Sequence, residues 1–93
     1  MVYTVYILYS PGFHKIYIGY SSDVHRRVYF HNHGLKKKSY TYKFRPWILI
    51  YTEEYNNKSQ AMRREKQLKT SQGRKFAWEK VKEFLQSSGS SGS

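Results

Sequence analysis

The sequence predicts one small α+β domain, a three-stranded and mainly antiparallel sheet flanked by helices, with the elements in the order ββαβαα. Three observations support this fold class. The chain has 93 residues, which suits one domain with one core. Near its start, two runs rich in β-branched and aromatic residues are separated by a Pro-Gly pair. Three later segments carry apolar residues at helical spacing.

The strands are short runs of residues that favour extended backbone. We expect them over residues 2–9, 14–20 and 46–54. Pro11 and Gly12 suit a turn between the first two, because proline presets φ and glycine tolerates positive φ. If these are the only two loop residues, Tyr6 lies directly across from Tyr17. The third strand begins at Pro46. Proline has no backbone N–H to donate to a neighbouring strand, and the first position of a strand tolerates this.

The first helix is expected to follow a serine cap. Either Ser21 or Ser22 accepts a hydrogen bond from the helix start, and the acidic residue that follows suits the first turn. The helix should end at Asn32 or His33, because Gly34 is a natural residue just past a helix end.

The C-terminal third predicts two more helices and a tail. Ser59 caps a helix that continues to about Thr70, and Gly73 breaks it. Residues 74–86 form the last helix, with apolar residues along one stripe. Residues 87–93 are only Ser and Gly, so we assign residues 1–86 to the domain and 87–93 to a flexible tail.

Charge and composition indicate a nucleic-acid partner. The chain has 17 Lys and Arg against 6 Asp and Glu, a formal net charge of +11, and 18% aromatic residues. Phosphates favour clustered cations, and bases stack on aromatic rings. The absence of cysteine excludes disulfides, thiolate metal sites and a cysteine nucleophile. We find neither a signal-peptide layout nor an apolar run long enough to span a membrane. We therefore expect the protein in the cytoplasm, where it could associate with the nucleoid.

Two polar residues share the apolar stripe of the first helix. Val24, Arg27, Val28 and His31 are spaced i, i+3, i+4 and i+7, so they lie along one face. Since the two valines direct that face toward the core, we expect Arg27 and His31 at or near the sheet rather than in open water.

The second helix repeats this pattern with a carboxylate. Glu65 lies among Ala61, Met62 and Leu68 on the apolar stripe. A carboxylate drawn into an apolar face must be paired or bind a metal, because an unpaired buried charge is very costly. One interpretation is therefore an ion pair between Glu65 and Arg27 that only closes the core.

The other interpretation is a catalytic site. Tyr6, Tyr17, Arg27, His31 and Glu65 come from four separate elements of the predicted fold. Together they supply what phosphodiester hydrolysis needs: a proton acceptor, a cation for the charge that develops on phosphate, and a metal ligand.

These residues also resemble the GIY-YIG nuclease superfamily, and most of all its small stand-alone bacterial members. Thr4-Val5-Tyr6 stands where the first motif is expected, and Tyr17-Ile18-Gly19 is the second motif intact. The segment over residues 21–32 is similar to the helix that carries an Arg and a His one turn apart. The segment over residues 61–66, Ala-Met-Arg-Arg-Glu-Lys, is similar to the helix that carries the metal-binding Glu. The resemblance covers about residues 2–82.

The resemblance implies a divalent-metal-dependent endonuclease, a hydrolase that cuts DNA with weak sequence preference. By position, Glu65 would hold one Mg²⁺ or Mn²⁺, and Tyr6 or Tyr17 would act as general base, its pKa lowered by nearby cations such as Arg27. Arg27 would neutralise the transition-state phosphate, and His31 would orient the nucleophile or bind phosphate. Gly19 would let the backbone pass close to the site.

A nucleic-acid-binding module without useful catalysis is the alternative. The asparagine that several family members carry near the C-terminal end of the site has no counterpart after Asn57. In either case the substrate, DNA rather than RNA, would meet a basic and aromatic loop over residues 35–45 and the start of the last helix. The nucleic-acid-binding residues we expect are Lys36, Lys37, Lys38, Tyr40, Tyr42, Lys43, Arg74 and Lys75.

Overall fold

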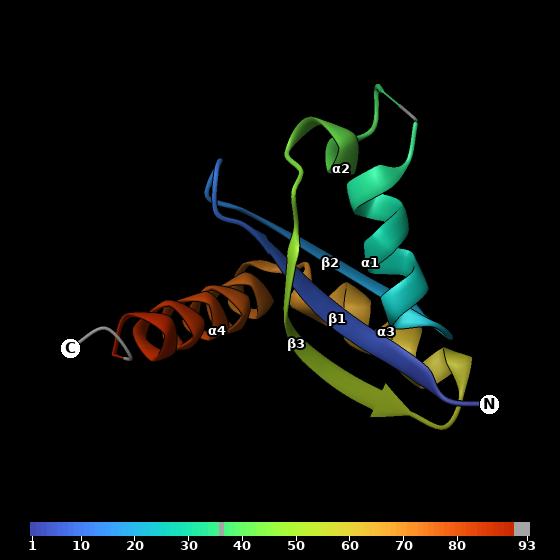
Figure 1. Cartoon of the computed structure of the whole chain (residues 1–93). Coiled ribbons are helices and arrows are strands. Elements are labelled where there is room, and N and C mark those ends of the chain that lie inside the picture. Colours follow the sequence, from blue (N-terminus) through green and yellow to red (C-terminus); the bar gives the residue numbers. More distant parts are fainter. Residues whose placement is uncertain (36, 91–93) are drawn as a thin grey trace.

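The computed structural model describes residues 1–35 and 37–90, with side chains up to residue 87, and confirms the α+β class. The elements are β1 (Tyr3–Ser10), β2 (Lys15–Ser21), α1 (Val24–His33), α2 (Tyr40–Lys43), β3 (Ile48–Tyr55), α3 (Lys58–Leu68) and α4 (Ser71–Ser90). The predicted order ββαβαα holds, and a single-turn helix, α2, is added inside the segment expected to be a loop (Figure 1).

The sheet is antiparallel, with the strand order β2-β1-β3. The predicted register of the first hairpin is wrong by two residues, since Tyr6 pairs with Gly19 and Leu8 pairs with Tyr17. The reason is the turn: Ser10 pairs with Lys15, so residues 11–14 form a four-residue loop instead of a two-residue one. Because side chains alternate with a period of two, a shift of two keeps Tyr6 and Tyr17 on the same face, now diagonal to each other.

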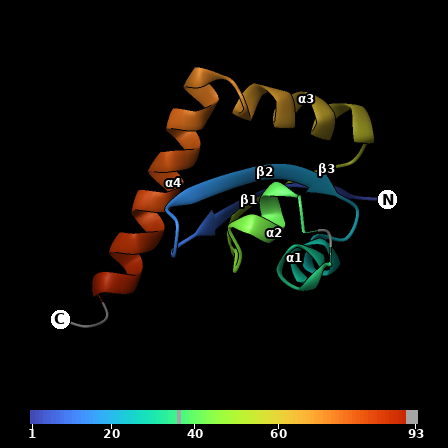
Figure 2. The same cartoon turned by 90° about the horizontal axis from the view of Figure 1, so that it is seen from above.

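Helices cover both faces of the sheet. Figure 2 shows α3 on one side and α1 and α2 on the other, while α4 starts on the α3 side and runs past the end of the sheet. Val5 and Ile7 of β1 face α3 and α4 and are fully buried, whereas Tyr6 and Leu8 face α1 and α2. Because β1 is buried on both faces, truncating one of its large side chains to alanine should cost about 2–5 kcal/mol.

Asx side chains cap α1 and α3, in place of the predicted serines. Asp23 accepts a hydrogen bond from the backbone N–H of Arg26 at 3.2 Å. Asn57 accepts one from the backbone N–H of Gln60 at 2.9 Å. The helices therefore begin one or two residues away from the predicted positions, which is the usual uncertainty at helix ends. Gly34 ends α1 as expected, its N–H donating to the carbonyl of Phe30 at 2.7 Å.

Gly73 does not break the helix, contrary to the prediction. The chain turns at Lys69 and Thr70, and α4 starts at Ser71. Gly73 lies inside α4 against the end of α3, where an added Cβ would stand 2.4 Å from the Cα of Leu68. Its role is thus close packing of two helices. α4 continues to Ser90, so residues 87–90 belong to a helix and not to the predicted tail, while residues 91–93 lie outside the described part of the chain.

Polar contacts attach the α1–α2 layer to the sheet. The side-chain amide of Asn32 accepts from the backbone N–H of Trp47 at 2.6 Å and donates to its carbonyl at 3.0 Å. The hydroxyl of Ser10 donates to the carbonyl of Phe44 at 2.6 Å. The position of α1 is therefore set by hydrogen bonds as well as by apolar packing. In the described residues, none of the helices combines the length and apolarity needed to cross a membrane.

Candidate active site

Two tyrosines from neighbouring strands meet above Gly19. Tyr6 projects from β1 across its pairing partner, and its ring centroid lies 6.2 Å from that of Tyr17. A Cβ at Gly19 would stand 2.7 Å from the hydroxyl oxygen of Tyr6 and 3.1 Å from the Tyr17 ring. The first distance is too short for any Cβ and the second is tighter than usual, so a larger residue at this position would displace the phenols.

His31 completes a buried cluster with the two phenols. It is 8% exposed, and its Nε2 lies 3.2 Å from the hydroxyl oxygen of Tyr6. Its ring centroid lies 4.8 Å from that of Tyr17. The structure thus confirms that His31 faces the sheet, as the spacing on α1 predicts.

Arg27 departs from the expectation in one respect. The residue is exposed rather than sheltered by the sheet. Even so, its charge opposes the rise that burial causes in the pKa of Tyr6, and it also acts on Tyr17 and His31. A long arginine side chain can reach a cluster while its stem stays in solvent, which explains the difference.

Glu65 approaches the same phenols from α3. Its side chain is 19% exposed, and its negative charge raises the pKa of both Tyr6 and Tyr17. Its ion pair is with Lys69, one helical turn away, at 3.7 Å. The structure therefore does not give Glu65 the core-closing pair with Arg27. The Lys69 side chain is half exposed, and such a pair holds a carboxylate only weakly.

Burial, and not the nearby cation, decides the protonation of the cluster. Burial and the adjoining Tyr17 raise the pKa of Tyr6 to about 12, against the opposing effect of Arg27. Burial likewise raises the pKa of Tyr17. The expectation that cations lower the tyrosine pKa is thus wrong in its net direction. Burial, reinforced by the Arg27 charge, lowers the pKa of His31 below 6.5, so at pH 7 the imidazole is neutral beside two neutral phenols.

Two grooves open on either side of this cluster. The larger has a volume of about 530 Å³ and includes Tyr17 among its lining residues. The smaller, about 250 Å³, includes Arg27, His31 and Tyr42. Tyr17 lines the larger groove and His31 lines the smaller one, so the contact between their rings links the walls of the two grooves.

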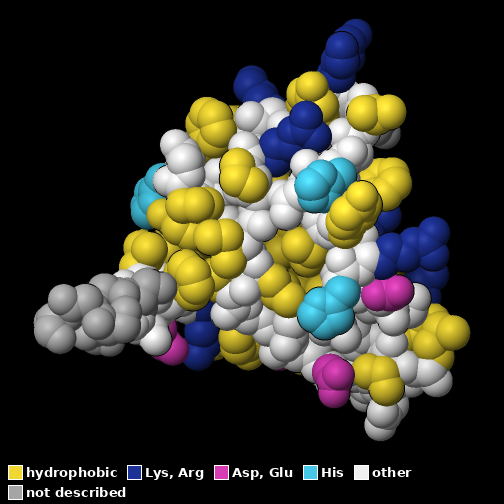
Figure 3. All heavy atoms as spheres, viewed as in Figure 1, with side chains coloured by type: hydrophobic (Ala, Val, Ile, Leu, Met, Phe, Trp, Pro, Cys, Tyr) yellow, Lys and Arg dark blue, Asp and Glu magenta, His cyan; other side chains and the backbone are white. Residues whose placement is uncertain are grey.

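The structure brings some of the predicted nucleic-acid-binding residues to these grooves. Tyr40 and Arg74 line the larger one and Tyr42 lines the smaller one. Exposed side chains outside both grooves are those of Lys37, Lys38, Lys43 and Lys75. Lys36 lies outside the described residues. In the view of Figure 3, Lys and Arg gather over the end that carries α1 and α2, whereas Asp and Glu appear only in the lower half.

A metal ion at this site would depend on one carboxylate. In the described part of the chain, no group of three His, Cys, Asp or Glu side chains is placed to hold a metal. The Glu65 charge acts on both phenols, and among the described residues its ion-pair partner is a half-exposed lysine. This donor set fits Mg²⁺, which keeps several waters and is commonly bound by one or two carboxylates plus substrate phosphate.

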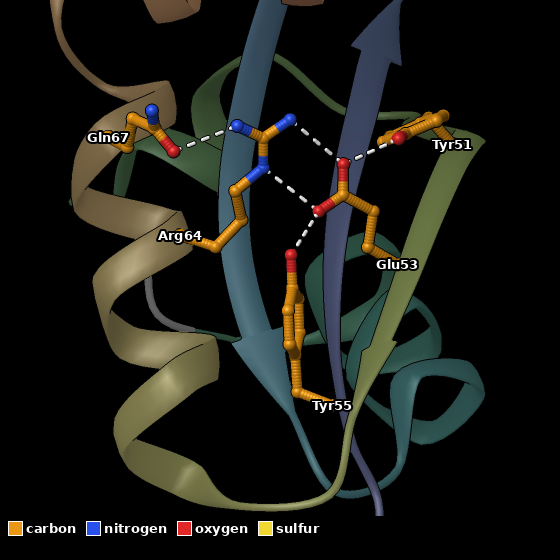
Figure 4. A network of polar contacts seen from close by, with 5 residues as sticks. All are labelled: Tyr51, Glu53, Tyr55, Arg64 and Gln67. Atoms are coloured by element: carbon orange, nitrogen blue, oxygen red, sulfur yellow. Dashed lines mark hydrogen bonds and ion pairs between the residues drawn. The ribbon is translucent and has the colours of Figure 1, made fainter.

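Sequence reasoning missed a second polar cluster, on the opposite face of the sheet. Figure 4 shows Arg64 of α3 reaching the carboxylate of Glu53 on β3, with N–O distances of 2.9 and 3.0 Å. The hydroxyls of Tyr51 and Tyr55 donate to the same carboxylate at 2.5 and 2.6 Å, and Gln67 accepts from Arg64 at 2.9 Å. The signal was present, because Tyr, Glu and Tyr at alternate positions of one strand share a face.

This second cluster, which we call the β3–α3 clamp, fixes the orientation of α3. Burial alone would raise the pKa of Glu53, but hydrogen bonds from Arg64 and both tyrosines lower it to about 2. Arg64 directly precedes Glu65, and neighbouring helical residues point about 100° apart. Holding Arg64 against the sheet therefore also fixes the direction in which Glu65 leaves the helix.

The fold and a match to a family model define the class of protein. The sequence matches the family model described as the GIY-YIG catalytic domain over residues 2–78, and the chain belongs to this family of nuclease domains. Its substrates are accordingly nucleic acids.

Particular relatives carry the name UPF0213. A UPF0213 protein of Staphylococcus haemolyticus is 45% identical over 56 residues, which is 60% of this chain and 67% of the relative. One from Staphylococcus epidermidis is 47% identical over the same shares. The solution NMR structure of a UPF0213 protein from Bacillus halodurans superimposes with a TM-score of 0.51 at 35% identity, covering 88% of this chain and 86% of that one. These are small proteins built around the same domain.

Proposed function

We propose that this protein is a divalent-metal-dependent endonuclease that hydrolyses phosphodiester bonds in DNA with weak sequence preference. One observation carries the proposal: the side chains of Tyr6, Tyr17 and His31 are in contact, and the charges of Arg27 and Glu65 act on this cluster. Phosphodiester hydrolysis requires a proton acceptor, a cation and a metal ligand within reach of one phosphate, and this cluster has all three.

Tyr6 and His31 act as a coupled base. A neutral phenol accepts a proton from water only if it gives up its own, and the neutral Nε2 of His31 lies 3.2 Å from the Tyr6 hydroxyl. As water attacks phosphorus, the water proton passes to the Tyr6 oxygen and the Tyr6 proton passes to His31, which becomes imidazolium. The P–O bond to the leaving group breaks, and the leaving oxygen takes a proton from solvent.

Arg27 and Tyr17 bind the reacting phosphate. The guanidinium of Arg27 is always charged and exposed, so it can pair with non-bridging oxygens as negative charge develops. The Tyr17 hydroxyl, protonated because its pKa is raised, donates a hydrogen bond to substrate. Tyr17 lines the larger groove and Arg27 the smaller one, and the charge of Arg27 acts on Tyr17.

Glu65 would hold one Mg²⁺ or Mn²⁺. When bound, the ion would neutralise charge on a phosphate oxygen and on the leaving group. The clamp fixes α3, which carries Glu65, and Lys69 can leave the carboxylate with little loss, since exposed pairs of this spacing contribute less than about 1 kcal/mol.

The test is a cleavage assay on labelled single-stranded, duplex and branched DNA, with RNA of the same sequences. Each substrate is incubated with Mg²⁺, Mn²⁺ or EDTA. We expect cleavage of DNA with either metal, none with EDTA, and a loss of at least about 100-fold in rate for Glu65→Gln. Glu79→Gln, an exposed acid on α4, is the matched control and should cleave normally.

A binding module without catalysis is the second candidate, favoured by the net charge of +11. In that case the wild-type chain cuts none of the substrates with any metal, while Glu65→Gln binds DNA as tightly as the wild type does. Cleavage that persists unchanged in Glu65→Gln contradicts the site assignment itself.

A further inference from the structure

The larger groove extends away from the reacting cluster and is built from side chains that the proposed chemistry does not use. Tyr17 is shared with the cluster, and the remaining walls come from the β1–β2 turn, β2, α2, the end of α3 and the start of α4. A polynucleotide that places one phosphate at the cluster must continue in both directions. This groove is placed to hold the polynucleotide on one side of that phosphate.

Three cations line the groove. They are Lys15 of β2, Lys69 at the end of α3 and Arg74 of α4, and all three are exposed. No Asp or Glu is among the described residues that line it. Tyr40 lines the same groove as Arg74, whose charge opposes the rise that burial causes in the pKa of Tyr40. Cations from three separate elements on one groove match a chain of phosphates.

Aromatic side chains supply preformed surfaces along the same groove. Tyr40 is held in place, its hydroxyl donating to the carbonyl of Ile16 at 3.1 Å and its ring stacked on Trp47 at 5.7 Å. At the far end, Trp78 packs on His14 with ring centroids 4.7 Å apart. Rings that are already fixed lose little entropy when a base stacks on them.

The backbone of the β1–β2 turn supports this far wall. His14 has a φ of 53°, in the left-handed region that non-glycine residues rarely adopt. Its ring is held between Trp78 and the hydroxyl of Tyr9, which lies 2.9 Å from its Nδ1. The surrounding contacts thus maintain a conformation that costs about 1–3 kcal/mol, and such residues concentrate at functional sites.

We propose that this groove binds the nucleotides on one side of the scissile phosphate, with Lys15, Lys69 and Arg74 on phosphates and Trp78 stacked on a base. The inference rests on the proposed function for the identity of the strand. Lys69 connects the two regions, since it contacts Glu65 and also lines the groove. A strand in the groove draws Lys69 onto a phosphate and leaves the Glu65 carboxylate free.

The first test measures binding in EDTA, so that cleavage does not interfere. The double variant Lys69→Gln/Arg74→Gln is compared with Lys58→Gln/Lys66→Gln, which removes the same charge from exposed positions of α3 outside the groove. The probe is a fluorescent single-stranded oligothymidylate over a salt series. We expect the groove variant to lower the magnitude of the salt slope by about 1.4, or 0.7 for each phosphate contact. Equal slopes and equal affinities in the two variants overturn the proposal.

The second test uses the wild-type chain, so a folding defect does not enter. Trp47 is 3% exposed, and fluorescence quenching by a strand therefore reports on Trp78. Oligothymidylate should quench the emission, whereas an abasic phosphodiester chain of the same length should not, because it has no base to stack. Equal quenching by both chains contradicts stacking at Trp78.

The two proposals fail separately. If the groove variant loses affinity selectively but no substrate is ever cut, the groove assignment stands and the proposed nuclease activity fails. If DNA is cut in a Glu65-dependent manner while both double variants bind alike, the nuclease stands and the strand runs elsewhere.

Discussion

The molecule contains two clusters of nearly the same composition that do opposite things. The reacting cluster and the β3–α3 clamp each contain two tyrosines, one arginine and one glutamate. In the clamp, the Glu53 carboxylate receives four hydrogen bonds of 2.5–3.0 Å, two of them from Arg64. In the reacting cluster, Glu65 has a lysine at 3.7 Å and Arg27 is exposed.

The difference shows that the two clusters are distinguished by how fully their carboxylates are hydrogen-bonded, and not by residue type. A fully bonded carboxylate has a structural role, whereas a loosely paired one is available for chemistry. A carboxylate whose oxygens are fully hydrogen-bonded is stabilised as the anion and holds two elements together. One that is loosely paired beside an open groove keeps its oxygens available for a ligand. α3 contributes to both clusters through adjacent residues, since Arg64 belongs to the clamp (Figure 4) and Glu65 to the reacting cluster.

Removing one hydroxyl from each cluster should give the largest contrast. Tyr6→Phe removes the proton relay to His31 and should lower kcat by about 10²–10⁴-fold. Tyr51→Phe removes one hydrogen bond of the clamp and should leave kcat close to wild type, at a cost of about 1 kcal/mol in stability. Single-turnover cleavage and urea unfolding measure the two effects. Similar losses of kcat in both variants would count against the distinction.

Gly19→Ala should produce the next largest effect. The new Cβ would stand 2.7 Å from the Tyr6 hydroxyl, so the phenol must move, and a displacement of 1 Å at a reacting group can cost about 100-fold in rate. Gly12→Ala is the control, because a Cβ there meets nothing within 4 Å. Cleavage rates are compared at equal folded fraction. A fully active Gly19→Ala chain would mean that the position of the Tyr6 phenol is unimportant.

The pH dependence should follow His31. Because burial lowers its pKa below 6.5, the imidazole is neutral at pH 7 and becomes protonated only in acid. The cleavage rate should therefore fall below that lowered pKa, approaching tenfold per pH unit, and stay level from pH 7 to 9, since the pKa of Tyr6 is about 12. His31→Gln should be slow at every pH and lack the acidic limb. An unchanged acidic limb in that variant assigns it to another group.

Breaking the clamp should affect stability more than chemistry. Glu53→Gln should cost about 2 kcal/mol, since it weakens charge-assisted hydrogen bonds, and should slow cleavage only severalfold by loosening α3. Glu53 has its pKa lowered from 4.5 to about 2, so its stabilisation is complete above pH 4.5 and is lost as pH falls toward 2. Urea unfolding between pH 7 and 2 should show this loss in the wild type and not in Glu53→Gln.

The sequence is sufficient for the fold class and for placing Tyr6, Tyr17 and His31 on one face of the sheet, and the reasons are local. Helical spacing places His31 on the buried face of α1, and strand alternation keeps Tyr6 and Tyr17 on one face even though the register prediction is wrong by two. Glu65 stands out because it is a carboxylate on the apolar stripe of its helix, where a hydrophobic side chain would be expected. Each of these inferences depends on one element at a time.

What could not be predicted depends on contacts between elements. The partner of Glu65 turned out to be Lys69, and the direction of the tyrosine pKa shifts follows from burial, which a sequence does not give. The clamp joins residues 11 positions apart on a strand and a helix. The length of the first turn depends on His14, whose left-handed backbone is held by Tyr9 and Trp78 from elsewhere in the fold.

The most direct test of this account is the single-turnover cleavage rate of Glu65→Gln beside that of Glu53→Gln, in Mg²⁺ and in Mn²⁺. Both changes replace a half-buried carboxylate with an amide, one in each cluster. We predict that Glu65→Gln loses at least about 100-fold in rate while it unfolds at nearly the wild-type urea concentration, and that Glu53→Gln shows the reverse. Equal cleavage rates for the two variants would contradict the assignment of Glu65 to the chemistry.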